Sequence, residues 1–281
     1  ASQAVCRIER RGFRGARQKC HPQNKKYRPL EKILTSNQFF IRKKNLTFPY
    51  ILLDGKEHHH LSKVARLKAK EKIWLFDEEG RRYLAQIEEI RPKETHLLIL
   101  EKIEREEPKV KITLGQALVN QKKMEEIIRR SVELGVATFV PLKTARSIIK
   151  IEVKAERKLE RWQKIAQEAL KQSKRSFMPL ILPPQSLQNF LKEEASEMKL
   201  LLSENRGKYL RDLLLQRAPK SRNKPPSSVV ILVGPEGGWA KEEEESILDH
   251  GFEAISLGKH TLRTETASLS ALALISHFWN L

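Results

Sequence analysis

The chain has 281 residues, 40% of which are hydrophobic, which excludes an intrinsically disordered protein and favours two domains of unequal size. No apolar run approaches the roughly 20 residues that cross a bilayer. Its two cysteines, Cys6 and Cys20, exclude a disulfide framework or a zinc site, so we expect a cytoplasmic protein without a membrane span or a metal. The formal net charge of +19 favours nucleic-acid binding over a merely solvated basic surface.

Residues 1–35 differ from the rest of the chain. They hold ten Lys and Arg against two acidic residues, which supplies +8 of the net charge and leaves +11 for residues 36–281. The segment has no hydrophobic periodicity and mixes its basic residues with Gly, Gln and Pro, which indicates a disordered basic arm. It lacks the apolar core of a secretory signal, and a transit peptide remains the alternative because Arg is abundant.

The pattern of residues 36–106 is typical of a small β-barrel or sandwich. Short runs rich in β-branched and aromatic residues are separated by turn formers such as Asp54-Gly55. One short helix is expected at about 57–67. The strand-like runs are Phe39–Ile41, Tyr50–Leu53, Lys72–Phe76, Tyr83–Ile87 and His96–Leu100.

After a charged linker at 104–108 the pattern changes to alternating strands and helices. The strands are near-continuous apolar runs, and the helices carry apolar residues on one face, as at Met124, Ile127 and Ile128. This alternation predicts an α/β fold with a buried parallel sheet covered by helices. Strands are expected at 110–118, 138–142, 199–203, 229–233 and 253–257, and helices at 122–134, 155–173, 207–216, 241–250 and 266–279.

The strand at 229–233 leads directly into Gly234–Trp239, which reads GPEGGW. Glycines allow a ligand to approach the backbone closely, and Pro235 fixes one turn. Four glutamates, Glu242 to Glu245, fill the start of the next helix, where they complement the helix dipole and repel a phosphate. The spacing is that of neither a P-loop nor a dinucleotide fingerprint, so a nucleoside-like ligand without phosphates is favoured. Trp239 is either part of the core or a stacking surface.

A second segment, Ser256–Ala267, leaves a strand, passes Gly258 and enters a helix of small residues. Arg263 and Glu265 stand at the start of that helix, and ionised groups are seldom buried unpaired. The residues alone leave two interpretations open, a functional pair or a helix cap held by an ion pair.

Together these two segments resemble the bacterial 16S rRNA uridine N3-methyltransferase family, which belongs to the SPOUT class. The family shows G-P-E-G-G after a strand, and L-G-x-x-x-L-R-T-E-T-A about twenty residues later. The resemblance covers residues 37–281 and includes motifs at Glu57–Leu61, Glu133–Val136 and Glu168–Ala169. It implies an RNA-binding, PUA-like β-barrel at 36–106 and a SPOUT methyltransferase domain at 107–281 that ends in a trefoil knot. Knots are too rare to be predicted from a pattern.

In this family the knot loops bind S-adenosylmethionine and two subunits form a homodimer, so the resemblance implies both here. The target that it implies is N3 of uridine 1498 in the 16S rRNA of the small ribosomal subunit. The cofactor-binding residues implied by the motifs are Leu202, Ser203, Glu204, Gly234, Pro235, Glu236, Gly237, Gly238, Ser256, Leu257, Gly258 and Leu262.

The reaction that the resemblance implies makes demands on the catalytic residues. Uracil N3 must lose a proton before or during attack, so a base, or a cation that stabilises the developing uridylate, would help. We expect Arg263 to act electrostatically near the uracil or the cofactor carboxylate. We expect Glu265 to orient Arg263 or to accept the proton.

The resemblance also places His59, His60 and Arg66 on the RNA-facing side of the barrel, with an ordinary exposed helix as the alternative. Arg42 and Lys68 add basic charge for contacts with the RNA backbone. The run of three histidines at 58–60 does not predict a metal site, because consecutive helical residues point about 100° apart.

The chain departs from the family pattern at Gln38, Lys70 and Asn120, where the family usually shows Arg, Gly and Lys. These changes affect RNA contacts and one turn rather than the cofactor loops. Two rival functions remain. A related SPOUT enzyme that methylates ribose 2′-oxygens of tRNA or rRNA would bind the same cofactor, whereas a non-catalytic RNA-binding protein would bind none.

Overall fold

The computed structural model describes residues 38–77, 81–103, 108–147, 155–173, 175, 177–204, 206–217 and 225–279. The predicted basic arm at 1–35 and most of the predicted linker at 104–108 lie outside these ranges. None of the helices within them is long and apolar enough to cross a membrane. Two separate sheets form from these residues, and the predicted domain limits at 36–106 and 107–281 stay predictions.

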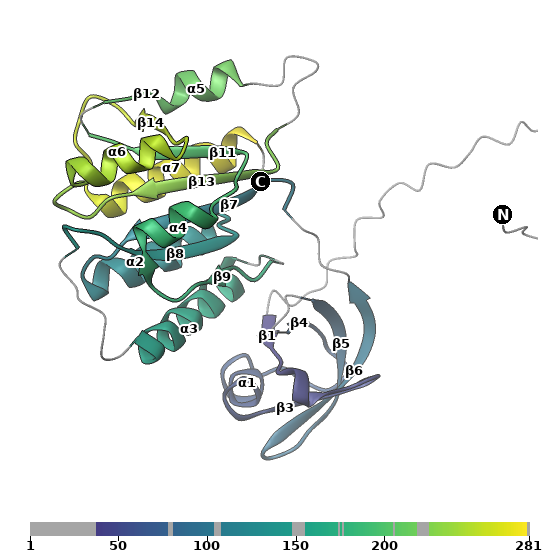
Figure 1. Ribbon diagram of the computed structural model, residues 1–281. Coiled ribbons are helices and arrows are strands. Elements are labelled where there is room, and N and C mark those ends of the chain that lie inside the picture. The colour runs from purple at the N-terminus through teal and green to yellow at the C-terminus, as the bar shows by residue number, and fades with distance from the viewer. Residues whose placement is uncertain are drawn as a thin grey trace, which may run out of the picture. The chain divides into compact units, whose positions relative to one another are not determined.

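The first sheet has six strands in the order β1-β4-β5-β6-β3-β2 and is curled (Figure 1). Its neighbouring strands are antiparallel, except that β1 and β4 run parallel. Alternate side chains point inward, so Ile73, Leu75 and Leu97 are fully buried. The strands are β1 (Gln38–Phe40), β2 (Leu46–Thr47), β3 (Tyr50–Asp54), β4 (Lys72–Phe76), β5 (Arg82–Ile90) and β6 (Glu94–Ile103).

The five strands expected in this region are confirmed, and β2 is an addition because two residues carry no readable pattern. The helix expected at about 57–67 is wrong at both ends. Helix α1 (Gly55–His59) starts earlier and continues as a π-helical turn, η2 (His60–Val64). The helix cannot extend to residue 67, because the backbone of Arg66 takes a positive φ of 51° that no right-handed helix contains.

The second sheet is entirely parallel, in the order β10-β8-β7-β13-β11-β14-β12, and β9 pairs with β8 beside it. Helices connect its strands and cover both of its faces (Figure 1), which confirms the predicted α/β domain. The strands are β7 (Lys111–Ala117), β8 (Thr138–Lys143), β9 (Leu180–Ile181), β10 (Gln185–Ser186), β11 (Met198–Leu202), β12 (Lys208–Tyr209), β13 (Ser228–Val233) and β14 (Glu253–Ser256). The helices are α2 (Gln121–Glu133), α3 (Ala155–Ser173), α4 (Leu187–Glu193), α5 (Leu210–Gln216), α6 (Lys241–Asp249) and α7 (Thr264–Phe278).

Strand β13 shows why its sequence is a continuous apolar run. Successive side chains point to opposite faces of the sheet. Val229, Ile231 and Val233 enter the core shared with α2, α3, α5 and α7, whereas Val230 and Leu232 enter the core shared with α4 and α6. Each fully buried Val, Leu or Ile side chain stabilises the fold by about 1.5–3 kcal/mol, so both faces of this strand contribute.

The predicted helices are confirmed with changed ends. Helix α5 begins at Leu210 rather than at 207, because Lys208 and Tyr209 pair with β14 as β12. Helix α7 begins two positions before the predicted 266, at Thr264. Helix α4 was not expected; it has seven residues and starts where the hydroxyl of Ser186 accepts the backbone amide of Asn189 at 3.2 Å.

The Glu133–Val136 motif has a structural explanation. Gly135 follows α2 with a φ of 103°, and a Cβ there would lie 2.5 Å from the guanidinium of Arg175. Arg175 donates to the carbonyl oxygen of Val132 at 3.1 Å, and burial lowers the pKa of this arginine. Gly135 and Arg175 together allow the free carbonyl oxygens at the end of α2 to be hydrogen-bonded, so this motif has a structural role.

The last strand and the last helix of the domain contact different elements. Strand β14 pairs with β11 and β12, whereas α7, which follows it, packs against α2. The connection at 257–263 therefore runs past the carboxyl ends of the neighbouring strands. The trefoil knot that the resemblance implies at this point stays a prediction.

Candidate functional site

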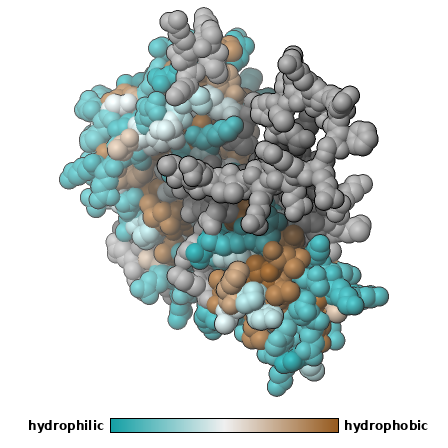
Figure 2. Space-filling model, turned by 90° about the vertical axis from the view of Figure 1, so that its right-hand side faces the viewer, coloured by the Kyte–Doolittle hydropathy of each residue, from teal (hydrophilic) through white to brown (hydrophobic). Residues whose placement is uncertain are grey.

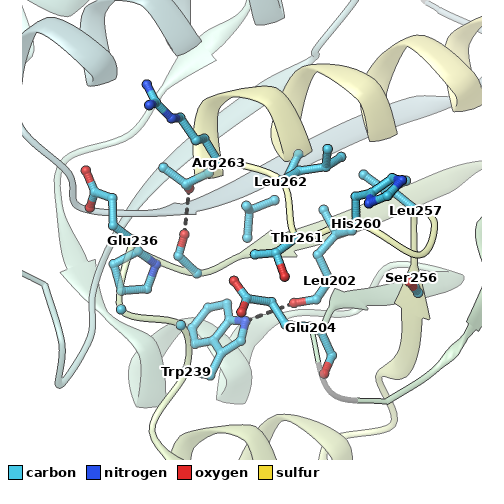
Figure 3. A pocket seen from close by; sticks show the side chains of 18 of the residues that line it. Leu202, Glu204, Glu236, Trp239, Ser256, Leu257, His260, Thr261, Leu262 and Arg263 are labelled. Atoms are coloured by element: carbon cyan, nitrogen blue, oxygen red, sulfur yellow. Dashed lines mark hydrogen bonds between the residues drawn. The ribbon is translucent and has the colours of Figure 1, made fainter.

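A pocket of about 380 Å³ opens at the carboxyl ends of β11, β13 and β14 (Figure 3). Open parallel sheets bind their ligands at this edge, and the volume is in the usual range for small-molecule sites. The loops that follow the three strands form its wall. Every predicted cofactor-binding residue lies in that wall: Leu202, Ser203, Glu204, Gly234, Pro235, Glu236, Gly237, Gly238, Ser256, Leu257, Gly258 and Leu262.

Trp239 contributes both to the core and to the pocket. Its side chain is 9% exposed and packs in the core with α4 and α6, while it also lines the pocket. The indole Nε1 donates to the carbonyl oxygen of Leu202 at 3.1 Å (Figure 3). A Cβ on Gly234 would lie 3.2 Å from the same nitrogen. The indole therefore joins the loop after β13 to the end of β11, and residue 234 has little room for a side chain.

The glutamates at the start of α6 accept hydrogen bonds from the protein, and they do not form a binding site for an anion. Glu244 is 7% exposed, and its Oε1 accepts the hydroxyl of Ser203 at 2.7 Å. Glu243 accepts the backbone amides of Ala145 at 2.7 Å and Ala240 at 3.2 Å. The first turn thus carries its own negative charge, which disfavours a phosphate in this part of the pocket.

A buried polar network joins the pocket loops to the sheet and to α7. The hydroxyl of Thr264 donates to the carbonyl oxygen of Gly234 at 2.6 Å and accepts the side-chain amide of Gln116 at 3.0 Å. The hydroxyl of Ser268 is hydrogen-bonded to the carbonyl oxygens of the Gln116 side chain and of Thr264. Because all of these groups are buried, each needs its partner.

We expect Thr264→Val to lower the free energy of unfolding by about 1–3 kcal/mol, because the shape is kept but buried partners lose their hydrogen bonds. Urea unfolding followed by tryptophan fluorescence measures the change. Thr266→Val is the matched control, since residue 266 is exposed on the same helix and its replacement should cost little. Equal losses in the two variants would show that the network contributes nothing.

Charged side chains line several parts of the pocket. Figure 3 shows Glu236 and Arg263 on the same side, with Leu257 and His260 opposite them. Arg263 is the exposed residue immediately before α7. Arg146, which sequence reasoning missed, also lines the pocket, and it donates to the carbonyl oxygen of Gly237 at 2.8 Å. Its loop lies 91 positions away in the chain, so no local motif could indicate it.

The predicted catalytic residues, Arg263 and Glu265, both lie at the start of α7. Glu265 faces a residue that the sequence did not indicate: its Oε2 is 3.5 Å from Nζ of Lys123 on α2. Lys123 also donates to Oε1 of Glu236 at 3.0 Å. The predicted roles of Arg263 and Glu265 stay predictions, and Lys123 joins them as a neighbour of the site.

The five residues predicted to bind RNA, Arg42, His59, His60, Arg66 and Lys68, belong to the part of the chain that forms the first sheet and its helix. All five are exposed. Large apolar side chains are exposed on this sheet as well, at Phe48, Tyr50 and Leu100. Figure 2 shows apolar surface among hydrophilic surface over this sheet.

The three consecutive histidines point in different directions. His58 is 6% exposed and hydrogen-bonds through Nδ1 to the hydroxyl of Thr95 at 2.8 Å, whereas His59 and His60 are exposed. The ring of His60 lies against that of Phe39. Among the described residues, no three His, Cys, Asp or Glu side chains are grouped as metal ligands.

The parallel sheet and its pocket define the class of this protein. Residues 105–276 match the model of the RNA methyltransferase domain, and residues 53–112 match that of the RNA methyltransferase PUA domain. The second domain is thus a SPOUT-type methyltransferase domain, and the first is PUA-like.

Similar proteins narrow the class to one family. The chain is 31% identical to ribosomal RNA small subunit methyltransferase E of Bacillus subtilis, over 82% of this chain and 90% of that protein. It is 34% identical to the Aquifex aeolicus protein of the same name, over 81% and 94%. A solved structure of the Neisseria gonorrhoeae enzyme of that name, bound to S-adenosylmethionine, shows 33% identity and a TM-score of 0.74 over 86% of this chain and 98% of that one. The chain belongs to the ribosomal RNA small subunit methyltransferase E family.

Proposed function

We propose that this protein transfers a methyl group from S-adenosylmethionine to N3 of uridine 1498 in the 16S rRNA of the small ribosomal subunit. The observation that carries the proposal is the convergence of three loops, after β11, β13 and β14, on one pocket with apolar, acidic and arginine side chains. The similarity to an enzyme whose structure contains S-adenosylmethionine supports the choice of cofactor.

The side chains of the pocket match the parts of this cofactor. Leu202, Leu257 and Leu262 offer apolar surface for adenine. Glu204 offers acceptors for the ribose hydroxyls or the ammonium group of the cofactor. The acidic start of α6 fits a ligand without phosphates. When bound, the cofactor supplies a methyl group on a positively charged sulfur.

The residues at the start of α7 support the proposed chemistry. As N3 of uracil loses its proton, negative charge spreads over the ring, and the guanidinium of Arg263 stabilises it. The carboxylate of Glu265 lies within the same first turn and accepts the proton or orients its neighbours. The positive end of the α7 dipole adds to the stabilisation of the uridylate.

The first sheet supplies the proposed RNA contacts. Arg42, Arg66 and Lys68 are exposed cations for the phosphate backbone, and the exposed rings of His59 and His60 accompany them. Such contacts hold the RNA without reading its sequence. The target uridine must then be unpaired or flipped out of its stack to reach the pocket.

A homodimer and a cytoplasmic location, where small ribosomal subunits are found, belong to the same proposal. Apolar side chains of the second domain that are exposed in the single chain support a dimer, among them Tyr209, Leu215 and Leu274. Sedimentation equilibrium of the purified protein tests this part, and a monomer at micromolar concentration would remove it.

Two measurements test the function. Calorimetric titration with S-adenosylhomocysteine should show binding, and its absence would favour the non-catalytic RNA-binding protein. Small subunits that lack the modification are then incubated with the protein and S-adenosylmethionine, and their nucleosides are analysed by mass spectrometry. N3-methyluridine is expected, whereas a ribose 2′-O-methylated nucleoside would assign the chain to the related SPOUT activity.

A further inference from the structure

One ammonium group bridges two carboxylates beside the pocket. Lys123, in the first turn of α2, lies 3.0 Å from Oε1 of Glu236 and 3.5 Å from Oε2 of Glu265. Glu236 belongs to the loop after β13 and lines the pocket, and Glu265 belongs to the first turn of α7. Three elements that are distant in the sequence therefore meet at one cation.

The contact with Glu265 is electrostatic rather than a hydrogen bond. Oε2 of Glu265 is buried and has no hydrogen-bond partner within the described part of the chain. The ammonium at 3.5 Å is at the limit of hydrogen-bond distance and does not meet the geometry of one. A buried carboxylate oxygen that receives no proton from a donor is costly, and it keeps its capacity to accept a proton from another group.

The negative charges around Lys123 keep its ammonium group protonated. The hydrogen bond to Glu236, together with the charges of Glu236 and Glu265, raises the pKa of Lys123. The ammonium is therefore positive throughout the neutral range. The next acid along α2, Glu125, pairs with Arg161 of α3 at 2.6 Å, so that ion pair is separate from the cluster at Lys123. Without Lys123, Glu236 and Glu265 would repel each other.

We propose that Lys123 is a positioning residue for methyl transfer, which ties the Glu236 loop to the start of α7 and so fixes Glu265 and Arg263 relative to the pocket. The proposal rests on the proposed function, because it assigns Lys123 a part in that reaction. Lys123 acts through the two carboxylates and need not touch cofactor or RNA. Its position in the first turn of α2 explains why motifs at 234–238 and 256–267 did not indicate it.

The test compares variants at positions 122, 123 and 236 of the full chain in single-turnover methylation of small subunits, with saturating cofactor. Lys123→Met should lower the rate by about 100-fold, since small misplacements of reacting groups have effects of that size. Lys123→Arg keeps the charge and should recover most of the rate.

Lys122→Met is the matched control. Residue 122 is exposed on the same helical turn, so this variant loses the same charge away from the cluster and should keep the wild-type rate. Adding Glu236→Gln to Lys123→Met should lower the rate by less than the product of the two single effects, because both changes break one unit. Thermal melting near that of the wild type shows that each variant is folded.

Two results would overturn the proposal. One is a wild-type rate for Lys123→Met. The other is an equal loss of rate in Lys123→Met and Lys123→Arg, which is what a purely structural contact produces. Failure of the proposed function is distinct, because the wild-type protein itself would then form no N3-methyluridine.

Discussion

Arg263→Ala is expected to lower the rate of uridine methylation by about 100- to 1000-fold, the usual cost of removing one group that stabilises developing negative charge. Arg263 is exposed at the rim of the pocket immediately before α7, so its removal leaves no cavity in the core. The loss should therefore appear in turnover rather than in folding. Single-turnover methylation of small subunits with saturating cofactor measures it.

Arg263→Lys separates charge from shape. Lysine keeps the positive charge but lacks the planar, forked donors of arginine, so a partial recovery would indicate that charge dominates. Full recovery of the rate would show that the forked donors of arginine contribute nothing beyond the charge. If Arg263→Ala kept the wild-type turnover, Arg263 would have no part in the chemistry.

Gly207→Ala is expected to lower the free energy of unfolding by about 2–5 kcal/mol, through backbone strain and overpacking together. Gly207 has a φ of 122°, and a Cβ there would lie 2.6 Å from the carbonyl group of Ala254. Only backbone movement relieves this contact, and Ala254 belongs to β14, which leads into the third pocket loop. The variant should therefore bind S-adenosylhomocysteine more weakly as well.

Gly251→Ala is the control for Gly207→Ala. Gly251 has a φ of 82° and open space where a Cβ would be, so its replacement adds only the backbone cost of about 1–2 kcal/mol. Urea unfolding measures both variants, and calorimetry measures their affinity for S-adenosylhomocysteine. If the two variants lost equal stability, the close approach to β14 would be unimportant.

Two of the three pocket loops have a local pattern in the sequence, whereas the loop at Leu202–Glu204 was implied by the family resemblance alone. An apolar strand that enters a glycine-rich turn marks the edge of a parallel sheet, and both Gly234–Gly238 and Gly258 stand at such turns. The helices and strands that were not predicted are those without a local sequence pattern. Helix α4 and strands β2, β9, β10 and β12 are short, and β9, β10 and β12 also pair with strands that lie far along the chain.

The charged neighbours of the site could not be predicted for a related reason. Lys123 lies 113 positions before Glu236, and Arg146 lies 91 positions before Gly237. Each stands on an element with an ordinary helical or loop pattern, so only the fold brings it to the pocket. Trp239 was ambiguous because the same indole serves the core and the pocket wall.

The order of the pocket loops along the chain has a consequence for biosynthesis. The loops follow β11, β13 and β14, and α7, which holds the second loop in place through the hydrogen bond from Thr264 to Gly234, comes after all of them. A nascent chain can complete the curled first sheet while the ribosome is still making the second, but its cofactor site waits for the residues of α7. The cofactor pocket is therefore complete only after α7 has emerged from the ribosome.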